Sequence, residues 1–225
     1  MKAIIVTGAG TGLGKELSLL LAEQGYHLIL TGRTVEKLNE VKEQIEKSGG
    51  SATAIQLDLR NLEDIKEKAL LISKKHEIYS LVNNAGLGYF GPFSEISDTE
   101  IEEMFQTNVF GTINMTKAIL PYLEQHNEGL VLNIVSTAGL RGKKNEAVYC
   151  SSKFAVRGFT ESLQKEYEGT RIRFVAAYMG GMNTPFWNDS EHVADPTRLR
   201  SAAEVADIII ENLNKEEIVI ESKKS

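Results

Sequence analysis

The sequence predicts a doubly wound α/β fold, in which about seven parallel strands form a sheet covered by helices on both faces. Two observations lead to this prediction. Short β-rich runs alternate with longer amphipathic stretches, and most of these runs are apolar on both faces. Strands with two apolar faces are typical of a parallel sheet buried between helical layers. No repeat, low-complexity segment or linker interrupts the pattern, so residues 1–225 are expected to form a single domain.

The predicted elements follow one another along the chain. The strand candidates are residues 2–7 (KAIIVT), 26–31 (YHLILT), 51–57 (SATAIQL), 78–83 (IYSLVN), 130–136 (LVLNIVS), 172–178 (IRFVAAY) and 217–221 (EIVIE). The helix candidates lie between them, at 12–25, 34–48, 61–76, about 98–126, 147–168 and 201–214. Glycines follow several predicted helices, where left-handed C-caps are needed: Gly25, Gly49, Gly50, Gly129 and Gly169.

The composition is that of an ordinary globular protein, with 42% hydrophobic and 25% charged residues. A net charge of −6 argues against nucleic acid as a partner, because phosphate binding requires a basic field. The single cysteine excludes an internal disulfide. MKAIIVTG is too short for a signal peptide, and no apolar run approaches the roughly 20 residues of a membrane span. We therefore expect a cytoplasmic protein with no membrane partner.

A glycine-rich turn follows the first strand candidate. Gly8, Gly12 and Gly14 of TGAGTGLG stand between a strand and a helix. Glycines in this context let a pyrophosphate approach the backbone, and the N–H groups of the following helix then meet its negative charge. The alternative is a strand–helix turn that binds nothing. A P-loop is excluded, because the Lys-Ser/Thr pair at its required spacing is missing.

The second strand candidate ends in LTGRT, where a dinucleotide-binding chain selects its cofactor. An acidic residue at this position binds the ribose hydroxyls, whereas arginine accommodates a 2′-phosphate. The chain has Gly32 and Arg33 here, and no acid before Glu36. This favours NADP(H) over NAD(H); the alternative is a surface arginine that merely ends a strand.

Tyr149 and Lys153 are four residues apart on a predicted helix and therefore share one face. A free phenol has a pKa of about 10, too high for efficient acid–base chemistry near neutrality. A neighbouring ammonium shifts that pKa downward. Such a pair also arises by chance, so it gains meaning only from its context. Ser136 supplies some of this context: it closes the fifth strand candidate, where a hydroxyl can donate to a carbonyl oxygen.

Five features in the same order resemble the short-chain dehydrogenase/reductase family: TGAGTGLG, NNAG at 83–86, Asn108, Ser136 and YCSSK at 149–153. The resemblance covers Lys2 to about Thr184 and is to the NADP-preferring branch, either sepiapterin- or benzil-reductase-like or 3-oxoacyl-carrier-protein-reductase-like. It implies a Rossmann fold and a catalytic set. In that set Tyr149 is the acid/base, Ser136 orients the substrate carbonyl, Lys153 assists the tyrosine and the ribose, and Asn108 holds a proton-relay water.

The same resemblance implies which residues bind NADP(H). They are Gly8, Thr11, Gly12, Leu13, Gly14, Arg33, Asp58, Leu59, Asn84, Ala85, Gly86, Tyr149, Lys153 and Thr184. Asp58 matches the position that borders the adenine, although a solvated aspartate at a strand end would look the same. The chain departs from the family at Met179, where relatives have a proline. The loop beneath the nicotinamide therefore lacks the fixed φ of proline.

Apolar and aromatic residues follow the later strand candidates and predict the walls of a substrate pocket: Leu87, Tyr89, Phe90, Phe93, Leu140, Met179, Met182, Phe186 and Trp187. Among them we expect Tyr89, Phe93, Leu140, Met182 and Trp187 to contact the substrate. Residues 183–200 have two prolines and no clear period, which predicts a lid that excludes water. Such a pocket favours apolar or aromatic carbonyl compounds. Alternatively, these side chains only seal the edge of the sheet.

Together, these features predict an NADP(H)-dependent oxidoreductase that transfers hydride between nicotinamide and a small carbonyl or alcohol substrate, with no metal. One alternative is a 3-oxoacyl-carrier-protein reductase, whose acidic partner would bind RGKKN (141–145), Arg157 and Lys165. A less favoured alternative is a non-catalytic NADP-binding sensor. The helix candidates at 98–126 and 147–168 carry apolar residues on more than one face. This favours a homodimer or homotetramer, unless those faces simply pack on the sheet.

Overall fold

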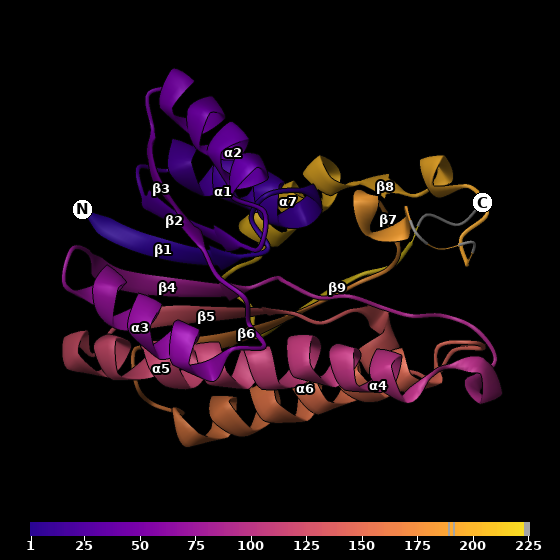
Figure 1. The fold of residues 1–225 in the computed structure, drawn as a ribbon. Helices are drawn as coiled ribbons and strands as arrows, with labels where there is room; N and C mark the ends of the chain where they lie inside the picture. The colour runs from indigo at the N-terminus through magenta and orange to yellow at the C-terminus, as the bar shows by residue number, and fades with distance from the viewer. Residues whose placement is uncertain (189, 191, 223–225) are drawn as a thin grey trace.

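The computed structural model describes residues 1–188, 190 and 192–222. Seven strands of this part of the chain form one parallel sheet, in the order β3-β2-β1-β4-β5-β6-β9 (Figure 1). Their bounds are β1 Lys2–Thr7, β2 His27–Gly32, β3 Ser51–Gln56, β4 Glu77–Asn83, β5 Gly129–Ile134, β6 Ile172–Met179 and β9 Glu217–Ile220. The predicted doubly wound sheet is confirmed.

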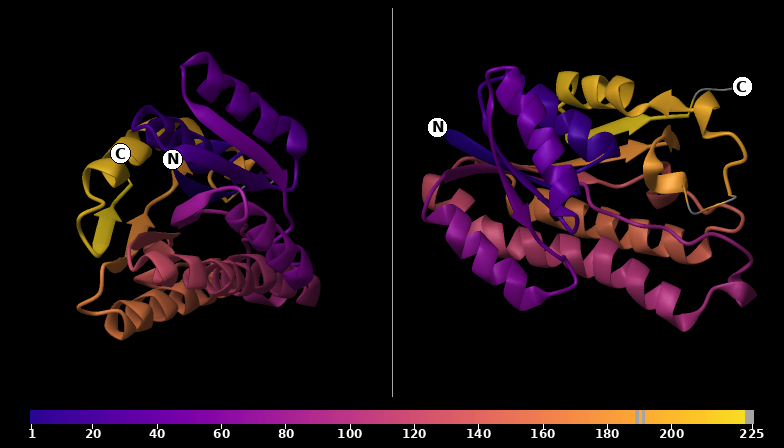
Figure 2. Two further views of the ribbon diagram at one scale, coloured as in Figure 1. Left: turned by 90° about the vertical axis from the view of Figure 1, so that its left-hand side faces the viewer. Right: turned by 45° about the horizontal axis from the view of Figure 1, so that its top comes forward.

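Helices cover both faces of the sheet (Figures 1 and 2). One layer contains α1 (Gly12–Glu23), α2 (Val35–Lys47) and α7 (Ala202–Glu211). The other contains α3 (Leu62–Ser73), α4 (Asp98–Met104), α5 (Thr112–His126) and α6 (Ala147–Glu166). Each layer has its own core: Ile4 and Val6 of β1 pack toward the first, Ala3 and Ile5 toward the second. This two-sided burial explains why the strand sequences are apolar at consecutive positions.

The order of the strands places a topological switch point between β1 and β4, which pair in parallel. The chain leaves β1 toward β2 on one side and later returns to add β4 on the other. Loops at the carboxyl ends of the two strands then part to opposite faces and leave a crevice, where open α/β sheets bind their ligands. The glycine turn after β1 and the NNAG loop after β4 both lie at this edge.

The helix expected over about 98–126 is present as one unbroken helical run, but its type changes in the middle. A π-helical segment, Phe105–Gly111, joins α4 to α5. The wider turn brings Gly111 against Leu59, whose Cβ would lie 2.9 Å from a Cβ added at Gly111. The apolar spacing of the sequence continues through this segment, so a local change of helix type was not apparent. Segments of this kind are frequent at functional sites.

Other expectations also needed correction. Gly129 is not a C-cap but the first residue of β5, and the left-handed position after α5 is taken by Asn127 (φ 46°). Ser136 does not end β5, which stops at Ile134. Two short strands, β7 (Met182–Asn183) and β8 (Arg200–Ser201), pair within the segment expected to be an irregular lid. Of that segment, residues 189 and 191 lie outside the described residues.

None of the helices in the described ranges combines the length and apolarity that crossing a bilayer requires.

Candidate active site

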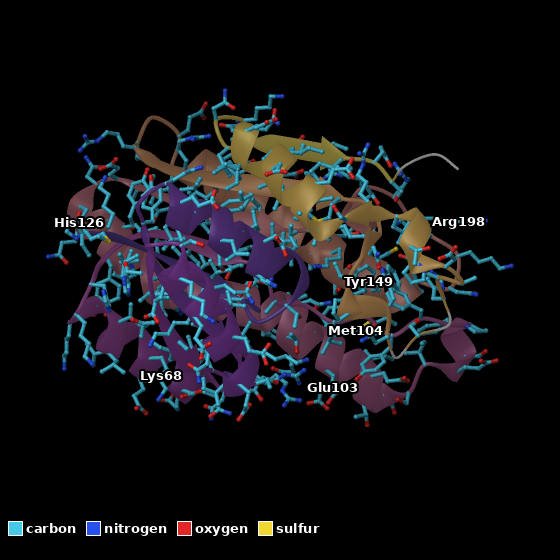
Figure 3. The ribbon with its side chains drawn as sticks, turned by 90° about the horizontal axis from the view of Figure 1, so that it is seen from above. Lys68, Glu103, Met104, His126, Tyr149 and Arg198 are labelled. Carbon is cyan, nitrogen blue, oxygen red and sulfur yellow. The ribbon has the colours of Figure 1, made fainter. Side chains whose placement is uncertain are left out.

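Tyr149 and Lys153 lie on the first turns of α6 and face the interior. Both are buried, with exposed fractions of 8% and 5%. The Lys153 Nζ atom donates a hydrogen bond to the Ile134 carbonyl at 3.2 Å and lies 5.7 Å from the centroid of the Tyr149 ring. Figure 3 shows Tyr149 near Met104, at the opposite end of the molecule from His126. The spacing of four residues therefore produces the predicted pair in three dimensions.

Burial perturbs both groups. It raises the pKa of the Tyr149 phenol well above its usual value, and the hydrogen bond with Ser136 opposes this rise only in part. The nearby Glu146 carboxylate raises the same pKa further. Burial lowers the pKa of Lys153 to about 8. The phenol is therefore held as a proton donor beside an ammonium that the surrounding protein solvates poorly.

Ser136 follows β5 in a strained backbone conformation, with φ 143° and ψ 154°. This region is adopted almost exclusively by glycine and costs about 1–3 kcal/mol for other residues. The Ser136 Oγ accepts a hydrogen bond from the Ala138 N–H at 3.1 Å, which fixes the start of the short turn Thr137–Gly139. The strain aims the hydroxyl at the phenol of Tyr149, its hydrogen-bond partner.

Asn108 lies within the π-helical segment and is 1% exposed. Its Nδ2 donates to the Leu87 carbonyl (2.8 Å) and to Ser152 Oγ (3.0 Å), while its Oδ1 accepts from the Leu87 N–H (2.9 Å). The Asn108 carbonyl accepts from Thr112 Oγ1 at 2.8 Å. The side chain thus ties the loop after β4 to α6, one residue before Lys153.

The glycine turn has the shape of a cradle. Gly8 and Gly12 have φ angles of 65° and 53°, which favour glycine. A Cβ at Gly14 would lie 2.4 Å from both the Gly8 carbonyl oxygen and Asn84 Nδ2. A Cβ at Gly12 would approach Thr184 to 3.4 Å, so Thr184 from the loop after β6 covers the turn. The turn and the N-terminus of α1 together suit a pyrophosphate.

The loop after β4 is bound to this cradle. The Thr7 hydroxyl accepts from the N–H groups of Asn84 and Ala85, each at 3.0 Å, and Asn84 Nδ2 donates to the Thr7 carbonyl at 2.9 Å. Asn83 turns inward and donates to Asn133 and Thr116. Gly86 lies beside Asn108 and Lys153: a Cβ there would be 3.2 Å from Asn108 Oδ1 and 3.5 Å from Lys153 Nζ. The predicted cofactor loop and the catalytic set are therefore contiguous.

A hollow of about 330 Å³ opens at the carboxyl ends of β2 and β3. It is lined by Arg33, Gln56, Asp58, Asp64 and Lys68. The Gln56 amide donates to the Arg33 carbonyl at 2.9 Å and fixes the backbone there. The Arg60 guanidinium hydrogen-bonds Asp58 and holds the pKa of that carboxyl below its usual value. Lys68 is paired with Asp64, so Arg33 is the cation of this hollow best placed to meet a phosphate.

Aromatic side chains cover the phenol of Tyr149. The Phe90 ring lies edge-on to it at 5.3 Å between centroids, and the Phe186 ring lies 6.0 Å away. Phe90 also contacts Trp187 at 5.2 Å and stacks on His192 at 4.7 Å. The Trp187 indole N–H donates to the Met182 carbonyl at 2.9 Å. Rings from the loop after β4 and from the segment after β6 therefore cover the phenol.

The structure gathers some of the predicted substrate residues and not others. Tyr89 and Trp187 lie at the covered site, and the Tyr89 hydroxyl donates to Glu103 at 2.6 Å. Met182 reaches this site only through its carbonyl, because its side chain packs against the core cluster beneath α1 and α7. Phe93, by contrast, is 66% exposed in the turn Phe93–Glu95. Leu140 packs in a separate cluster with Val135, Val156 and Tyr178. Both therefore stand apart from the rings around Tyr149.

Sequence reasoning missed two groups at this site, Glu146 and His192. Glu146 immediately precedes α6, and its carboxylate lies 3.0 Å from His192 Nε2. The sequence offers one signal for Glu146, an acid beside the YCSSK motif. For His192 it offers none, because the contact joins residues 46 positions apart.

Comparisons with known proteins agree with this geometry. The family model described as short chain dehydrogenase matches residues 2–194. An oxidoreductase from Listeria monocytogenes is 37% identical over 186 residues, which cover 81% of this chain and 75% of the relative. Sepiapterin reductase from Chlorobaculum tepidum is 28% identical, over 82% of this chain and 79% of that protein. A solved alcohol dehydrogenase from the archaeon Thermococcus sibiricus, complexed with 5-hydroxy-NADP, superposes with a TM-score of 0.88 at 27% identity, covering 98% of this chain and 96% of that one.

Proposed function

This chain belongs to the short-chain dehydrogenase family, and from that premise we propose that it is an NADP(H)-dependent reductase of small apolar or aromatic carbonyl compounds. The observation that carries the proposal is the placing of Tyr149, Ser136 and Lys153 together beneath a cover of aromatic rings. Two of its members, the buried Lys153 and the strained Ser136, lower stability.

The residues present fit NADP(H). The cradle of Gly8, Gly12 and Gly14 would hold the pyrophosphate, and Arg33 the 2′-phosphate, at the edge of the hollow shared with Asp58. When bound, the reduced cofactor supplies the hydride that reduces a carbonyl. We propose that the remaining predicted contacts complete the cofactor site; among them are Thr11, Leu13, Leu59, Ala85 and Thr184.

The chain itself supplies the proton. As hydride arrives at the carbonyl carbon, negative charge develops on the oxygen, and the Tyr149 hydroxyl donates its proton there; the product is the alcohol and the phenolate remains. Ser136 is the second hydroxyl at this position and donates a hydrogen bond to the same oxygen. The Lys153 ammonium stabilises the phenolate, which would otherwise be costly in so buried a place. Alcohol oxidation is the reverse of these steps.

The aromatic cover supports an apolar or aromatic substrate. Phe90 and Phe186 contact the Tyr149 ring, and Trp187 contacts both of them. We propose that the rings of a flat substrate take up such contacts. We propose that the described residues between 183 and 200 act as the cover of a closed site, from which water is excluded during the reaction.

A carrier-protein thioester is disfavoured by the surface charges. Arg141 is paired with Glu221, Arg157 with Glu161 and Lys143 with Glu146. The proposed basic landing patch is therefore largely neutralised by the chain's own carboxylates, which leaves little field for an acidic partner. A non-catalytic NADP-binding sensor is disfavoured because burial of the Lys153 charge lowers folding stability, and a protein without catalysis would gain nothing from it.

A substrate panel tests the proposal. Consumption of NADPH and of NADH is followed with an aryl ketone, a vicinal diketone, an aldose, a keto acid and a 3-oxoacyl thioester. We expect the aryl ketone and the diketone to react fastest and only with NADPH at low cofactor concentration. A sugar or a carrier thioester as best substrate would overturn the substrate class, and failure of every carbonyl in both directions would overturn the reductase assignment.

We also propose that this protein forms a homodimer or homotetramer through α4, α5 and α6. Phe110, in the π-helical segment between α4 and α5, is 48% exposed, and Phe154 on α6 is 42% exposed, which is unusual for such large apolar side chains. Sedimentation of the purified protein tests this, and a monomer at micromolar concentration would contradict it.

A further inference from the structure

Glu146 is a buried carboxylate that the proposed reaction does not use. It stands one turn before Tyr149 and is 8% exposed. Two nitrogen groups face it: His192 Nε2 lies 3.0 Å from one oxygen and Lys143 Nζ lies 3.8 Å from the other. A carboxylate in such a place is costly without partners, so its position calls for an explanation.

His192 carries the stronger of these contacts and belongs to the aromatic cover. Its ring stacks on Phe90, with 4.7 Å between centroids and 14° between planes, and also lies 6.2 Å from the Trp187 ring. One face of the imidazole thus contacts the aromatic rings, and its Nε2 edge contacts the Glu146 carboxylate. These contacts connect the cover, which comes from the chain after β6, to the first turn of the helix that bears Tyr149 and Lys153.

We propose that Glu146 is a positioning residue that fastens the aromatic cover over the site by binding His192. The proposal rests on the proposed function only in taking the space beneath the cover as the substrate site. In the closed arrangement the bond satisfies the Glu146 carboxylate and holds Phe186 and Trp187 above the phenol. When the cover leaves, Glu146 keeps only the more distant Lys143, so opening has a cost that closure removes.

The fastening has a second consequence for the phenol. Glu146 is one of the charges that raise the pKa of Tyr149. His192 contacts one oxygen of that carboxylate at 3.0 Å, so the fastening fixes where this charge stands relative to the phenol. The charged and titratable groups around this contact come from α6 and the loop before it: Glu146, Lys143, Tyr149 and Cys150. The other neighbours of the contact are two uncharged rings, Trp187 from the cover and Phe90 from the loop after β4.

Trp187 makes the proposal measurable without any substrate. It is the only tryptophan of the chain, so its fluorescence and its quenching by acrylamide report directly on the cover. Two substitutions separate the parts of the contact. His192→Phe keeps a ring against Phe90 and removes the bond; Glu146→Gln keeps the shape and an acceptor but removes the charge. The double variant shows whether the two residues act through each other.

Matched controls come from the same chain. Glu161→Gln removes the same charge from the same helix, from an ion pair with Arg157 away from the cover. His126→Phe makes the same change as His192→Phe at the far end of the molecule (Figure 3). Thermal melting of all variants confirms that each is folded before it is compared.

We expect His192→Phe and Glu146→Gln to make Trp187 more accessible to acrylamide, whereas the controls leave it unchanged. With an aryl ketone, KM should rise about tenfold while kcat changes little, as expected when a hydrogen bond to a charged group is lost from uniform binding. The double variant should be no worse than the more affected single one. Unchanged quenching in folded variants, or additive effects in the double variant, would overturn the proposal. Absent activity with altered quenching would leave the fastening intact and refute the proposed function instead.

Discussion

The substitution Lys153→Met separates the effect of the buried lysine on folding stability from its effect on activity. Methionine has nearly the shape of lysine but no charge, so the substitution removes the ammonium from its position beside Tyr149 and leaves the helix face filled. We expect the variant to be more stable than the wild type at neutral pH and nearly inactive. The two effects have one cause, the burial of a charge near the phenol.

The magnitude of the expected gain in stability follows from the shift in the pKa of Lys153 on folding. The pKa of Lys153 falls from 10.5 to about 8 on burial. This is a change of about 2.5 pKa units, which at about 1.36 kcal/mol per unit amounts to about 3 kcal/mol. Below pH 8 both the folded and the unfolded state are protonated and the whole cost is present. Between pH 8 and 10.5 the folded state releases a proton that the unfolded state keeps, so the stability of the wild type rises with pH. Above pH 10.5 the cost is gone.

The loss of activity can be sized in the same way. The Lys153 ammonium lies 5.7 Å from the centre of the Tyr149 ring. An opposite charge within about 4–6 Å typically lowers the pKa of an acid by about 1–3 units. We therefore expect the ammonium to stabilise the phenolate by about two pKa units, or about 3 kcal/mol. Without it, turnover should fall by about a hundredfold at neutral pH.

Urea unfolding at pH 7 and at pH 10 provides the assay. The free energy of unfolding of Lys153→Met should exceed that of the wild type by about 3 kcal/mol at pH 7 and by about 1 kcal/mol at pH 10. Comparing two pH values cancels the effect of the methionine's own packing, because packing does not titrate. If the difference in free energy of unfolding between the two proteins were the same at both pH values, burial of the Lys153 charge would not be destabilising the wild type. That result would refute the reasoning.

Three further outcomes are expected. Tyr149→Phe should bind NADPH nearly as tightly as the wild type, measured by cofactor fluorescence, yet lose at least a hundredfold in kcat, because the proton donor is gone; more than a tenth of the activity retained would remove Tyr149 from its role. Arg33→Ala should raise the dissociation constant for NADPH far more than that for NADH, and equal weakening would show that Arg33 does not contact the 2′-phosphate. Gly14→Ala should lower the free energy of unfolding by about 1–3 kcal/mol, since its Cβ meets the Gly8 carbonyl and Asn84 at 2.4 Å. An unchanged melting temperature would show that the backbone of the glycine turn can shift to accommodate the added Cβ.

Much of this architecture could be predicted from the sequence because the signals are local. The strand sequences are apolar at consecutive positions since both faces of the sheet are buried, as Ala3 to Val6 illustrate. The glycine turn is predictable because each of its glycines is required there: Gly8 and Gly12 have positive φ, and Gly14 has no room for a Cβ. The Tyr149–Lys153 pair follows from helix periodicity alone.

Other features depend on contacts that no local pattern records. The π-helical segment at Phe105–Gly111 continues the apolar spacing of an ordinary helix, so nothing in the sequence marks where the helix type changes. The contact of Glu146 with His192 joins two segments that only the fold brings together. The exposure of Phe93 likewise depends on how its loop turns outward, which composition does not determine.

The unfavourable features of this chain converge on one place. Among the described residues with positive φ other than glycine, Asn127 and Asn145 are of a type that tolerates the left-handed region, whereas Ser136 is not. Ser136 is the one that meets the phenol of Tyr149. The buried ammonium of Lys153, the buried carboxylate of Glu146 and the π-helical segment that carries Asn108 all lie around the same phenol. Each lowers stability, and selection for folding alone would remove them one by one. Their joint presence at the carboxyl edge of the sheet marks the place where the fold gives up stability, and this is also where the proposed reaction has its proton donor.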